Sequence, residues 1–357
     1  MGLEESTVTG KIIFGDEIFD GLTQFLKARK FSSIFILVDE NSLEYCIPEI
    51  IAKVPKLLVA EIIELESGES NKNIEVCTQV WTALGELGAD RNSLLINVGG
   101  GVITDLGGFV ASTFKRGIAF VNIPTTLLAQ VDASVGGKTG VDLGVLKNEV
   151  GVFANPEKLF INTRFLKTLP LREMKSGLAE VLKHGLVASE AYWNKCAEVD
   201  LEEVDFLEDI IRESIAIKST IVSIDPKEAG ERKKLNFGHS IGHAIESLVL
   251  ERGEETLLHG EAVAMGMICE SWISTQLTGL KTEQHEEVVR NICQYFPLYP
   301  IAQIDEHRIL ELMRHDKKND KGEIKMALLS SIGNAIAAKA VTLNVIVASF
   351  NYYRSLK

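Results

Sequence analysis

Short apolar runs alternate with helical patterns through the first half of the chain, and this alternation constrains the fold more than any other feature. Four runs rich in β-branched residues are typical of buried strands: residues 34–38, 57–63, 93–98 and 118–123. Between them lie helical stretches such as residues 72–88, which end at a glycine. Strands that alternate with helices predict a mainly parallel sheet covered by helices.

Long helical patterns dominate the second half of the chain. Expected helices span residues 172–189, 203–223, 238–251, 259–277, 282–294 and 306–314. Two later apolar runs, residues 326–333 and 335–343, are compatible with either strands or helix. We therefore predict two domains: an α/β domain over residues 1–170 and an all-α domain over residues 171–357.

Charge and composition restrict the partners and the compartment. The formal net charge is −13, which disfavours nucleic acid and anionic membranes as partners. No run approaches the ~18 apolar residues of a membrane helix, and the N-terminus lacks the basic start and apolar core of a secretory signal. The five cysteines are scattered and form no CxxC pair, which predicts reduced thiols and a cytoplasmic location.

A glycine-rich segment, INVGGGVITDLGGFVAS at residues 96–112, follows an expected strand and precedes an expected helix. Consecutive glycines let the backbone approach a pyrophosphate, and the amides of a helix N-terminus favour negative charge. The spacing departs from GxGxxG, and Asp105 is also explained as a helix cap, so the segment alone does not identify a nucleotide site. Asp39, at the end of the first clear strand, is placed to bind a ribose hydroxyl.

Two histidines four residues apart, His239 and His243, share one face of an expected helix. Such a pair can chelate zinc, act on a substrate, or be two ordinary polar residues. His259 opens another expected helix, and Glu180 lies among small and apolar residues, where an unpaired carboxylate is costly. A carboxylate with two imidazoles is a common catalytic zinc set, whereas an ion pair of Glu180 with Lys183 is the structural alternative.

Lys218 falls on an apolar helical stripe that Ile211, Ile215 and Val222 define by their spacing. A lysine in that position either extends outward along the surface or points into a polar cavity. The polar segment ERKKLNFGHS, residues 231–240, follows shortly and favours the cavity.

Together these segments resemble the 3-dehydroquinate synthase family of sugar-phosphate cyclases, from about residue 34 to residue 320. The resemblance is carried, in order, by the motifs GGGVITDLGGFVAS, FKRG, IPTTLLAQVDASVGGKTGVD, LKTLP, GLAEVLKHG, LNFGHSIGHAIE and LHGEAVAMGM. It implies an α/β nucleotide-binding domain, a helical domain that binds metal and substrate, and an active site in the cleft between them. The chain has Leu146 where many members have glycine before a Lys-Asn pair.

The resemblance also implies the cofactors and their ligands. Zinc would be held by Glu180, His239 and His259, a set that would accept cobalt as well. His243 would then contact the substrate phosphate rather than the metal. NAD would lie along Asp39, Asn41, Glu69, Lys72, Gly100, Gly101, Val102, Ile103, Thr104, Asp105, Thr125, Thr126, Lys138, Lys147, Phe165, Leu166, Lys167 and Thr168.

The implied partner is a small phosphorylated sugar acid, which suits a concentration of cations in an acidic protein. The catalytic residues implied are Asp132, Lys138, Lys183, Asn148 and His243. The substrate contacts implied are Lys147, Lys218, Arg232, Asn236, and one of Lys317 and Lys318. Arg116 would reach the site of the neighbouring subunit, which implies a homodimer.

The family's substrate is 3-deoxy-D-arabino-heptulosonate 7-phosphate, and its products are 3-dehydroquinate and phosphate, a step of the shikimate pathway toward chorismate and the aromatic amino acids. Hydride passes to NAD, phosphate is eliminated, the hydride returns, and the opened ring closes by an aldol step. The implied enzyme is thus a carbon–oxygen lyase. Alternatives are another cyclase such as 2-deoxy-scyllo-inosose synthase, a metal-dependent polyol dehydrogenase, or a non-catalytic protein that binds NAD and metal.

Overall fold

The computed structural model describes residues 5–7, 10–253, 257–300, 305–316 and 323–356. The chain divides into two compact units. The first comprises Met1–Met174 and Glu202–Ile215, and the second comprises Lys175–Leu201 and Ala216–Lys357. The chain therefore passes from one unit to the other three times, and the first passage lies close to the boundary predicted at residue 170.

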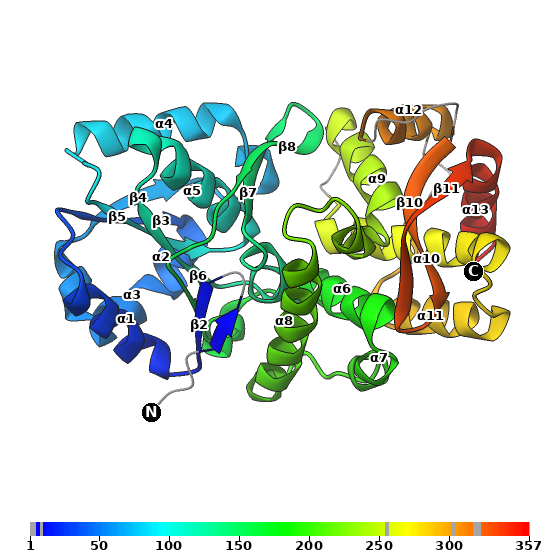
Figure 1. Cartoon of the computed structure of the whole chain (residues 1–357), viewed down its shortest axis with the longest axis horizontal. Helices are drawn as coiled ribbons and strands as arrows, with labels where there is room; N and C mark the ends of the chain where they lie inside the picture. Colours follow the sequence, from blue (N-terminus) through cyan, green and yellow to red (C-terminus); the bar gives the residue numbers. More distant parts are fainter. Residues whose placement is uncertain (1–4, 8–9, 254–256, 301–304, 317–322, 357) are drawn as a thin grey trace. The chain divides into compact units, whose positions relative to one another are not determined.

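The first unit is built on a seven-stranded sheet in the order β1-β2-β9-β6-β5-β3-β4. Figure 1 labels β2, β3, β4, β5 and β6 of this sheet. Neighbouring strands are parallel except β1 and β2 at one edge. The mainly parallel sheet predicted from the alternating pattern is confirmed. The strands span β1 Glu5–Thr7, β2 Gly10–Phe14, β3 Ile34–Asp39, β4 Glu61–Leu65, β5 Leu94–Gly99, β6 Ala119–Pro124 and β9 Lys158–Ile161.

Helices cover both faces of this sheet, because successive residues of a strand point to opposite sides. In β3, Ile36 and Val38 join the core shared with α1 and α3, whereas Phe35 and Leu37 join the core shared with α4 and α5. These helices and the short α2 span α1 Glu17–Ala28, α2 Glu40–Tyr45, α3 Ile47–Lys53, α4 Ile74–Glu86 and α5 Gly101–Thr113.

The apolar run at residues 57–63 is a strand only in its second half. Pro55–Val59 forms a short 3-10 helix, η1, and β4 begins at Glu61. Proline at the first helical position has a φ already suited to a helix, and Leu58 and Val59 are exposed. The strand predicted for residues 57–60 is therefore wrong.

A separate antiparallel hairpin, β7 Lys138–Leu143 and β8 Leu146–Phe153, packs against α5. The leucine at position 146 pairs with Leu143 across the turn of this hairpin. The other short helical turns of the unit are η2 Glu69–Asn71, η3 Phe114–Arg116, the π-helical η4 Ala129–Ala133, η5 Thr163–Thr168 and η6 Val204–Phe206.

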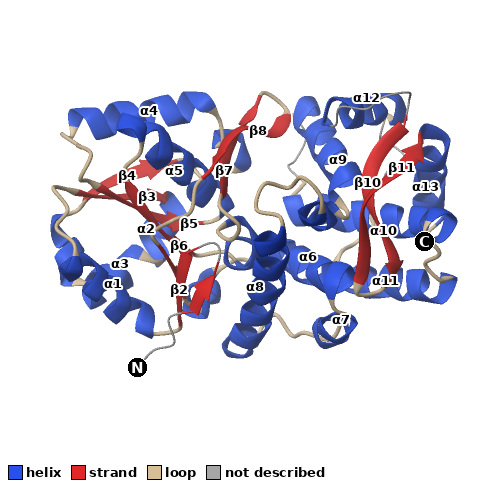
Figure 2. Ribbon diagram, in the orientation of Figure 1, coloured by secondary structure: helices blue, strands red, loops and turns tan. Residues whose placement is uncertain are grey.

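The second unit is mainly helical, as predicted (Figure 2). It also contains one antiparallel hairpin, β10 Glu323–Ser331 and β11 Asn334–Thr342, so the expectation of an all-α domain is corrected. Gly333, with a φ of 81°, makes the turn, and Ile324, Met326 and Leu328 are buried. The helices, two of which begin in the first unit, span α6 Leu171–Ala188, α7 Glu190–Cys196, α8 Leu207–Ile224, η7 Glu231–Asn236, α9 His239–Arg252, α10 His259–Leu277, α11 Thr282–Tyr295, α12 Glu306–Asp316 and α13 Leu343–Ser355.

Candidate active site

Five loops of the first unit lie at the edge of the sheet where its parallel strands end. The strands β9, β6, β5, β3 and β4 are successive neighbours in the sheet. Ligands of α/β sheets bind outside the carboxyl ends of such strands. The predicted NAD residues follow them in turn: Glu69 and Lys72 after β4, Asp39 and Asn41 at the end of β3, Gly100–Asp105 after β5, Thr125 and Thr126 after β6, and Phe165–Thr168 after β9.

The glycine-rich segment forms the turn from β5 into α5. Gly100 precedes α5 and has no side chain that could cap the first amides of the helix. Thr125 N donates to Gly99 O at 3.0 Å, which joins this turn to the loop after β6. Gly107 has a packing role, because a Cβ there would lie 2.1 Å from Asn97 Oδ1. The N-terminus of α5, at the edge of the sheet, suits a phosphate group.

Asp39 ends β3 and caps the short helix α2. Its Oδ1 accepts hydrogen bonds from Ser42 N and Ser42 Oγ, both at 2.7 Å. Asn41 is exposed in the first turn of α2. Capping alone accounts for an aspartate at this position, so a contact of Asp39 with a ribose stays a prediction.

Lys72 is buried and links segments that lie far apart in the sequence. Its Nζ donates to Asp105 Oδ2 and to Asn148 Oδ1, both at 2.7 Å. Burial opposes the charge of Lys72, but the carboxylates of Asp105 and Glu69 outweigh it and raise the pKa of the lysine. Lys72 is therefore a fixed cation, and Asp105 is its partner rather than the N-cap of α5.

Asp142, the last residue of the motif IPTTLLAQVDASVGGKTGVD, holds Lys147 and Asn148, a role that the motif did not predict. Lys147 Nζ donates to Asp142 Oδ2 at 2.7 Å, and Asn148 N donates to Asp142 Oδ1 at 2.7 Å. Lys147 also forms an ion pair with Glu69. Asn148 has a φ of 55°, a left-handed conformation that asparagine tolerates. The connected side chains form what we call the lysine network: Glu69, Lys72, Asp105, Asp142, Lys147 and Asn148.

Other predicted residues of the first unit differ in exposure. Asp132 is half-buried on the π-helical turn η4, a kind of turn frequent at functional sites. Lys138 is exposed at the start of β7, and Arg116 is exposed on η3. Phe165 is buried in the core of the sheet, so only its backbone remains for contact with a cofactor. Leu166 is likewise buried, whereas Lys167 and Thr168 are exposed.

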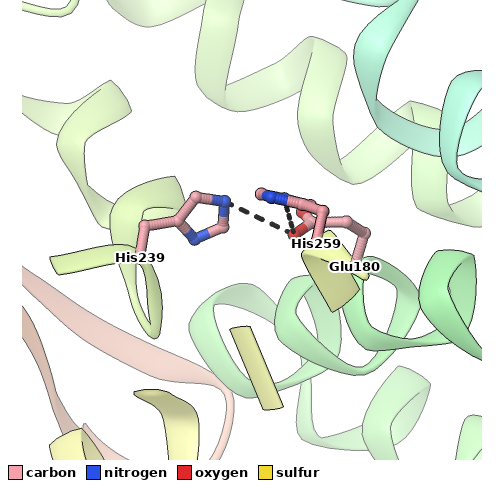
Figure 3. Close-up of side chains that lie close together, drawn as sticks. All are labelled: Glu180, His239 and His259. Carbon is pink, nitrogen blue, oxygen red and sulfur yellow. Dashed lines mark ion pairs between the residues drawn. The ribbon is translucent and has the colours of Figure 1, made fainter. Parts of the chain in front are cut away.

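In the second unit, Glu180, His239 and His259 point toward one another (Figure 3). Glu180 lies on α6 and is fully buried, while His239 and His259 are the first residues of α9 and α10. The Nε2 atoms of His239 and His259 lie 3.4 and 3.7 Å from Glu180 Oε1. The fold thus brings the three predicted metal ligands together, with one ligand atom of each within 4.8 Å of the others.

Both imidazoles are oriented through their Nδ1 atoms. His239 Nδ1 lies 3.1 Å from the carbonyl oxygen of Phe237, and His259 Nδ1 lies 3.2 Å from Glu246 Oε2. Because these partners only accept, each Nδ1 donates its proton, so a cation can bind each imidazole only through Nε2, in place of any proton there. One carboxylate and two such imidazoles are a ligand set for a divalent metal with an open position.

Lys183 forms an ion pair with Glu180 through Oε2, while Oε1 faces the imidazoles. The ion pair expected as the structural alternative and the ligand cluster therefore coexist. Burial and, next, the positive charge of Lys183 lower the pKa of His239 well below its usual range. Burial acts in the same direction on His259, but its bonds to Glu180 and Glu246 prevail and raise its pKa to about 10.

His243 lies one turn after His239 on α9. Its ring centroid is 5.0 Å from that of His239 and 5.8 Å from that of His259. His243, Glu246 and His259 also lie close enough to form a metal group. Since His259 Nδ1 already faces Glu246, its Nε2 atom is directed to the Glu180 cluster, and His243 lies beside that cluster.

The predicted substrate residues of the second unit are partly buried. Lys218, on α8, is 6% exposed, as expected for a lysine on a stripe that faces the core. Arg232 is buried on η7 and donates to the carbonyl oxygen of Pro226 at 2.8 Å. Asn236 donates from Nδ2 to Glu228 Oε1 at 2.7 Å. The last two candidates, Lys317 and Lys318, lie outside the described residues.

Three carboxylates support these residues although none was predicted as a site residue: Asp142, Glu246 and Glu270. Asp142 and Glu246 are the last residues of two of the motifs, whereas Glu270 lies outside all of them. Glu246 lies three residues after His243, on the same face of α9, and this spacing was a signal for it. Glu270 accepts hydrogen bonds from the start of α9, about thirty positions earlier in the chain. Asp142 binds residues across a hairpin turn. Neither Glu270 nor Asp142 therefore has a helical spacing to its partners that could have indicated its role.

Family models match two consecutive parts of the chain. The 3-dehydroquinate synthase N-terminal model matches residues 62–176, and the C-terminal model matches residues 177–319. A 3-dehydroquinate synthase from Parabacteroides distasonis is 43% identical over 346 residues, which cover 96% of this chain and 98% of the relative. This chain belongs to the 3-dehydroquinate synthase family. The resemblance predicted from the motifs is confirmed, and the chain is an enzyme of the sugar-phosphate cyclase type.

Solved cyclases share the fold of this 3-dehydroquinate synthase family member. A 2-deoxy-scyllo-inosose synthase, solved with carbaglucose-6-phosphate, NAD+ and Co2+, is 27% identical with a TM-score of 0.80, covering 94% of this chain and 95% of its own. A 2-epi-5-epi-valiolone synthase from Streptomyces hygroscopicus, solved with NAD+ and Zn2+, is 24% identical with a TM-score of 0.81, and both chains are covered completely. The higher identity to a 3-dehydroquinate synthase favours that function over the inosose synthase alternative.

Proposed function

We propose that this chain converts 3-deoxy-D-arabino-heptulosonate 7-phosphate to 3-dehydroquinate and inorganic phosphate, the shikimate-pathway reaction of its family. The observation that carries the proposal is the cluster of Glu180, His239 and His259 beside His243, in a chain 43% identical to a 3-dehydroquinate synthase. Because a carbon–oxygen bond is broken when phosphate leaves, the enzyme would be a lyase.

Zn2+ is the metal we propose for the cluster, with Co2+ as an acceptable replacement. The residues fit, because a buried carboxylate and two Nε2 atoms converge and each imidazole is already oriented through Nδ1. Related cyclases were solved with Co2+ or Zn2+. Such a cation, when bound, supplies Lewis-acid chemistry at a substrate oxygen.

NAD is the cofactor we propose for the carboxyl edge of the sheet. The first amides of α5, from Gly101 to Thr104, would meet its pyrophosphate, and the buried cation Lys72 would add positive charge nearby. Asp39 and Glu69, at the ends of neighbouring strands, are the candidates for its ribose hydroxyls. Both solved cyclases contain NAD+.

Cationic and amide side chains would bind the anionic groups of the substrate. The phosphate is assigned to Lys138, Lys147, Asn148 and His243. The carboxylate is assigned to Lys218, Arg232 and Asn236, with one of Lys317 and Lys318. Asp132 and Lys183 are assigned to the reacting hydroxyls, and the ion pair of Lys183 with Glu180 supports this role for the lysine.

Assembly and location remain predictions. Arg116 is exposed on η3, as contact with a second subunit would require, and a homodimer is proposed on this basis and on the family resemblance. A cytoplasmic location is proposed from the cysteine pattern. Within the described residues, no helix is long and apolar enough to span a membrane.

Incubation of the purified protein with the heptulosonate phosphate and catalytic NAD, followed by NMR, tests the proposal. We expect equal amounts of 3-dehydroquinate and phosphate with no accumulation of NADH, because the hydride returns within each turnover. Stoichiometric NADH would instead indicate a polyol dehydrogenase and would contradict the proposal.

A further inference from the structure

Glu270 is a buried carboxylate to which the proposed function gives no role. It lies on α10 and is fully buried. Both of its oxygens accept hydrogen bonds from the start of α9: Gly238 N donates to Oε2 at 2.7 Å, and Ile241 N donates to Oε1 at 3.1 Å. His239 lies between these two amides in the sequence. Glu270 therefore caps α9 from the neighbouring helix.

The cap acts where a helix has its positive end. The first N–H groups of a helix have no intrahelical partner, and they carry the positive end of its dipole. A carboxylate that accepts from them forms charge-assisted hydrogen bonds, which are stronger than neutral ones. In a buried setting water does not compete with these bonds. The first turn of α9 is thus fixed, and with it the direction in which His239 leaves the helix.

A second carboxylate also links α9 and α10, from the middle of α9 to the first residue of α10. Glu246, on α9, accepts from Nδ1 of His259, the first residue of α10. Near the start of α9 the two backbones are in contact, because a Cβ on Gly266 would lie only 1.9 Å from Gly238 O. The helices α9 and α10 are therefore joined by one carboxylate near each metal-binding imidazole.

We propose that Glu270 is a positioning residue for the metal site: it holds the first turn of α9 so that His239 faces Glu180 and His259 before a cation arrives. Glu270 acts through the backbone of α9. The inference rests on the metal site proposed above, at Glu180, His239 and His259.

Glu270→Gln tests the role directly, since it keeps the shape of the side chain but replaces one acceptor oxygen with an NH2 group. Zinc affinity of the metal-free protein is measured by competition with a chelator. We expect the Kd to rise about tenfold or more, as is typical when a supporting partner of a ligand is lost. The visible spectrum of the Co2+-loaded variant should also change, because the orientation of His239 changes.

Ser274→Ala is the matched control. Ser274 is buried one turn further along α10. Its hydroxyl donates to the backbone carbonyl of Glu270 at 2.6 Å and accepts from Leu329 N at 3.0 Å, so the change removes contacts at the backbone of Glu270 but leaves the carboxylate that caps α9. The zinc Kd of this control should stay within about twofold of the wild type, because the substitution removes only neutral hydrogen bonds, each with a modest net contribution. Equal zinc affinity in Glu270→Gln and the wild type would overturn the proposal, and so would an equal loss in Ser274→Ala.

Two further measurements separate the possible failures. If the wild type binds no zinc, or if Glu180→Gln does not weaken the binding, the metal site itself is refuted and the inference falls with it. If Glu270→Gln does not fold, hydrogen exchange of the metal-free wild type decides the matter. Protected amides at Gly238 and Ile241 support a cap formed before metal binding, whereas rapid exchange at both refutes it.

Discussion

The metal cluster, which is Glu180, His239 and His259, and the lysine network differ in how their side chains are arranged before a ligand binds. In the metal cluster, partners outside the ligand set orient the donors: the carbonyl of Phe237 holds His239, and Glu246 holds His259. The Nε2 atoms consequently converge on Glu180 Oε1, at 3.4 and 3.7 Å. A cation can bind there without a rearrangement of these side chains.

The lysine network, by contrast, is already neutralised by its own carboxylates. Its two lysines face three carboxylates, which leaves a formal excess of one negative charge. An incoming phosphate must therefore displace a carboxylate, and Glu69, whose side chain is 39% exposed, is the easiest to displace from Lys147. The contacts around the imidazoles thus form the metal site in advance, whereas the lysine network binds phosphate only when phosphate replaces a carboxylate as the partner of a lysine.

Among single substitutions at the two regions, Glu180→Gln should have the largest effect. Loss of a supporting partner alone typically costs 10- to 100-fold in metal affinity, so loss of a ligand should cost more than about a hundredfold, and activity should fall with it. Metal analysis and zinc titration provide the measurement. The double variant Glu180→Gln/Lys183→Met, which removes both buried charges, controls for instability and should still not bind zinc. Full zinc binding in either variant would contradict a preformed site at Glu180.

Lys147→Met should lower kcat/KM on the order of a hundredfold, because removal of one partner from a buried charge pair typically costs several kcal/mol. Its zinc content should equal that of the wild type, since the lysine network and the metal cluster belong to different units. Lys27→Met, an exposed lysine on α1, is the matched control and should leave both quantities unchanged. A loss of zinc in Lys147→Met would break the distinction between the two regions.

Two substitutions in the lysine network should change phosphate binding in opposite directions. Glu69→Gln removes the exposed competitor of a phosphate at Lys147, so the Kd for inorganic phosphate should fall several-fold. Asp142→Ala removes the acceptor that holds Lys147 and the backbone of Asn148, so the Kd should rise about tenfold. Calorimetric titration with phosphate measures both. A change of the same sign in the two variants would refute the exchange of partners.

A smaller effect concerns acid stability, in which the two units should differ. All seven histidines lie in the sequence of the second unit. His285, on α11, bonds to Ser271 Oγ at 2.9 Å, and burial lowers its pKa to about 4. The folded state keeps His285 neutral while the unfolded chain binds a proton below about pH 6.5, so the stability present above pH 6.5 is lost progressively as the pH falls toward 4.

The measurement compares melting temperatures of the wild type and His285→Gln from pH 7 to pH 4. The wild type should decline more steeply, by about 2–4 °C for each kcal/mol of stability lost. Parallel curves for the two proteins would show that His285 does not cause the acid sensitivity.

Local patterns in the sequence were enough to predict most helices and strands. The strands β3, β5 and β6 are mostly apolar on both faces, with Asn97 and Asn122 as buried exceptions. The long helices of the second unit keep a helical period. The run at residues 57–63 led to a wrong strand prediction because its first half is apolar yet exposed. The composition of β10 and β11 suits a helix as well as a strand, so the pattern did not decide between the two.

The candidate site could be predicted only in part. Glu180, His239 and His259 were recognisable as metal-binding residue types, but their convergence depends on the packing of three helices, and the family resemblance was needed to choose among the histidines. Asp142 and Glu270 were not predicted, because each accepts hydrogen bonds from backbone amides that only the folded chain brings near. In a sequence, such a buried carboxylate looks the same as a charge on the surface.

The central claim is that His239 belongs to a preformed metal site, while His243, one turn further along the same helix, does not. The most direct measurement is the zinc content of purified wild type, His239→Ala and His243→Ala, with phosphate affinity determined on the same samples. We predict that His239→Ala loses the metal, whereas His243→Ala keeps the zinc content of the wild type and binds phosphate more weakly. A loss of zinc from His243→Ala equal to that from His239→Ala would contradict this account.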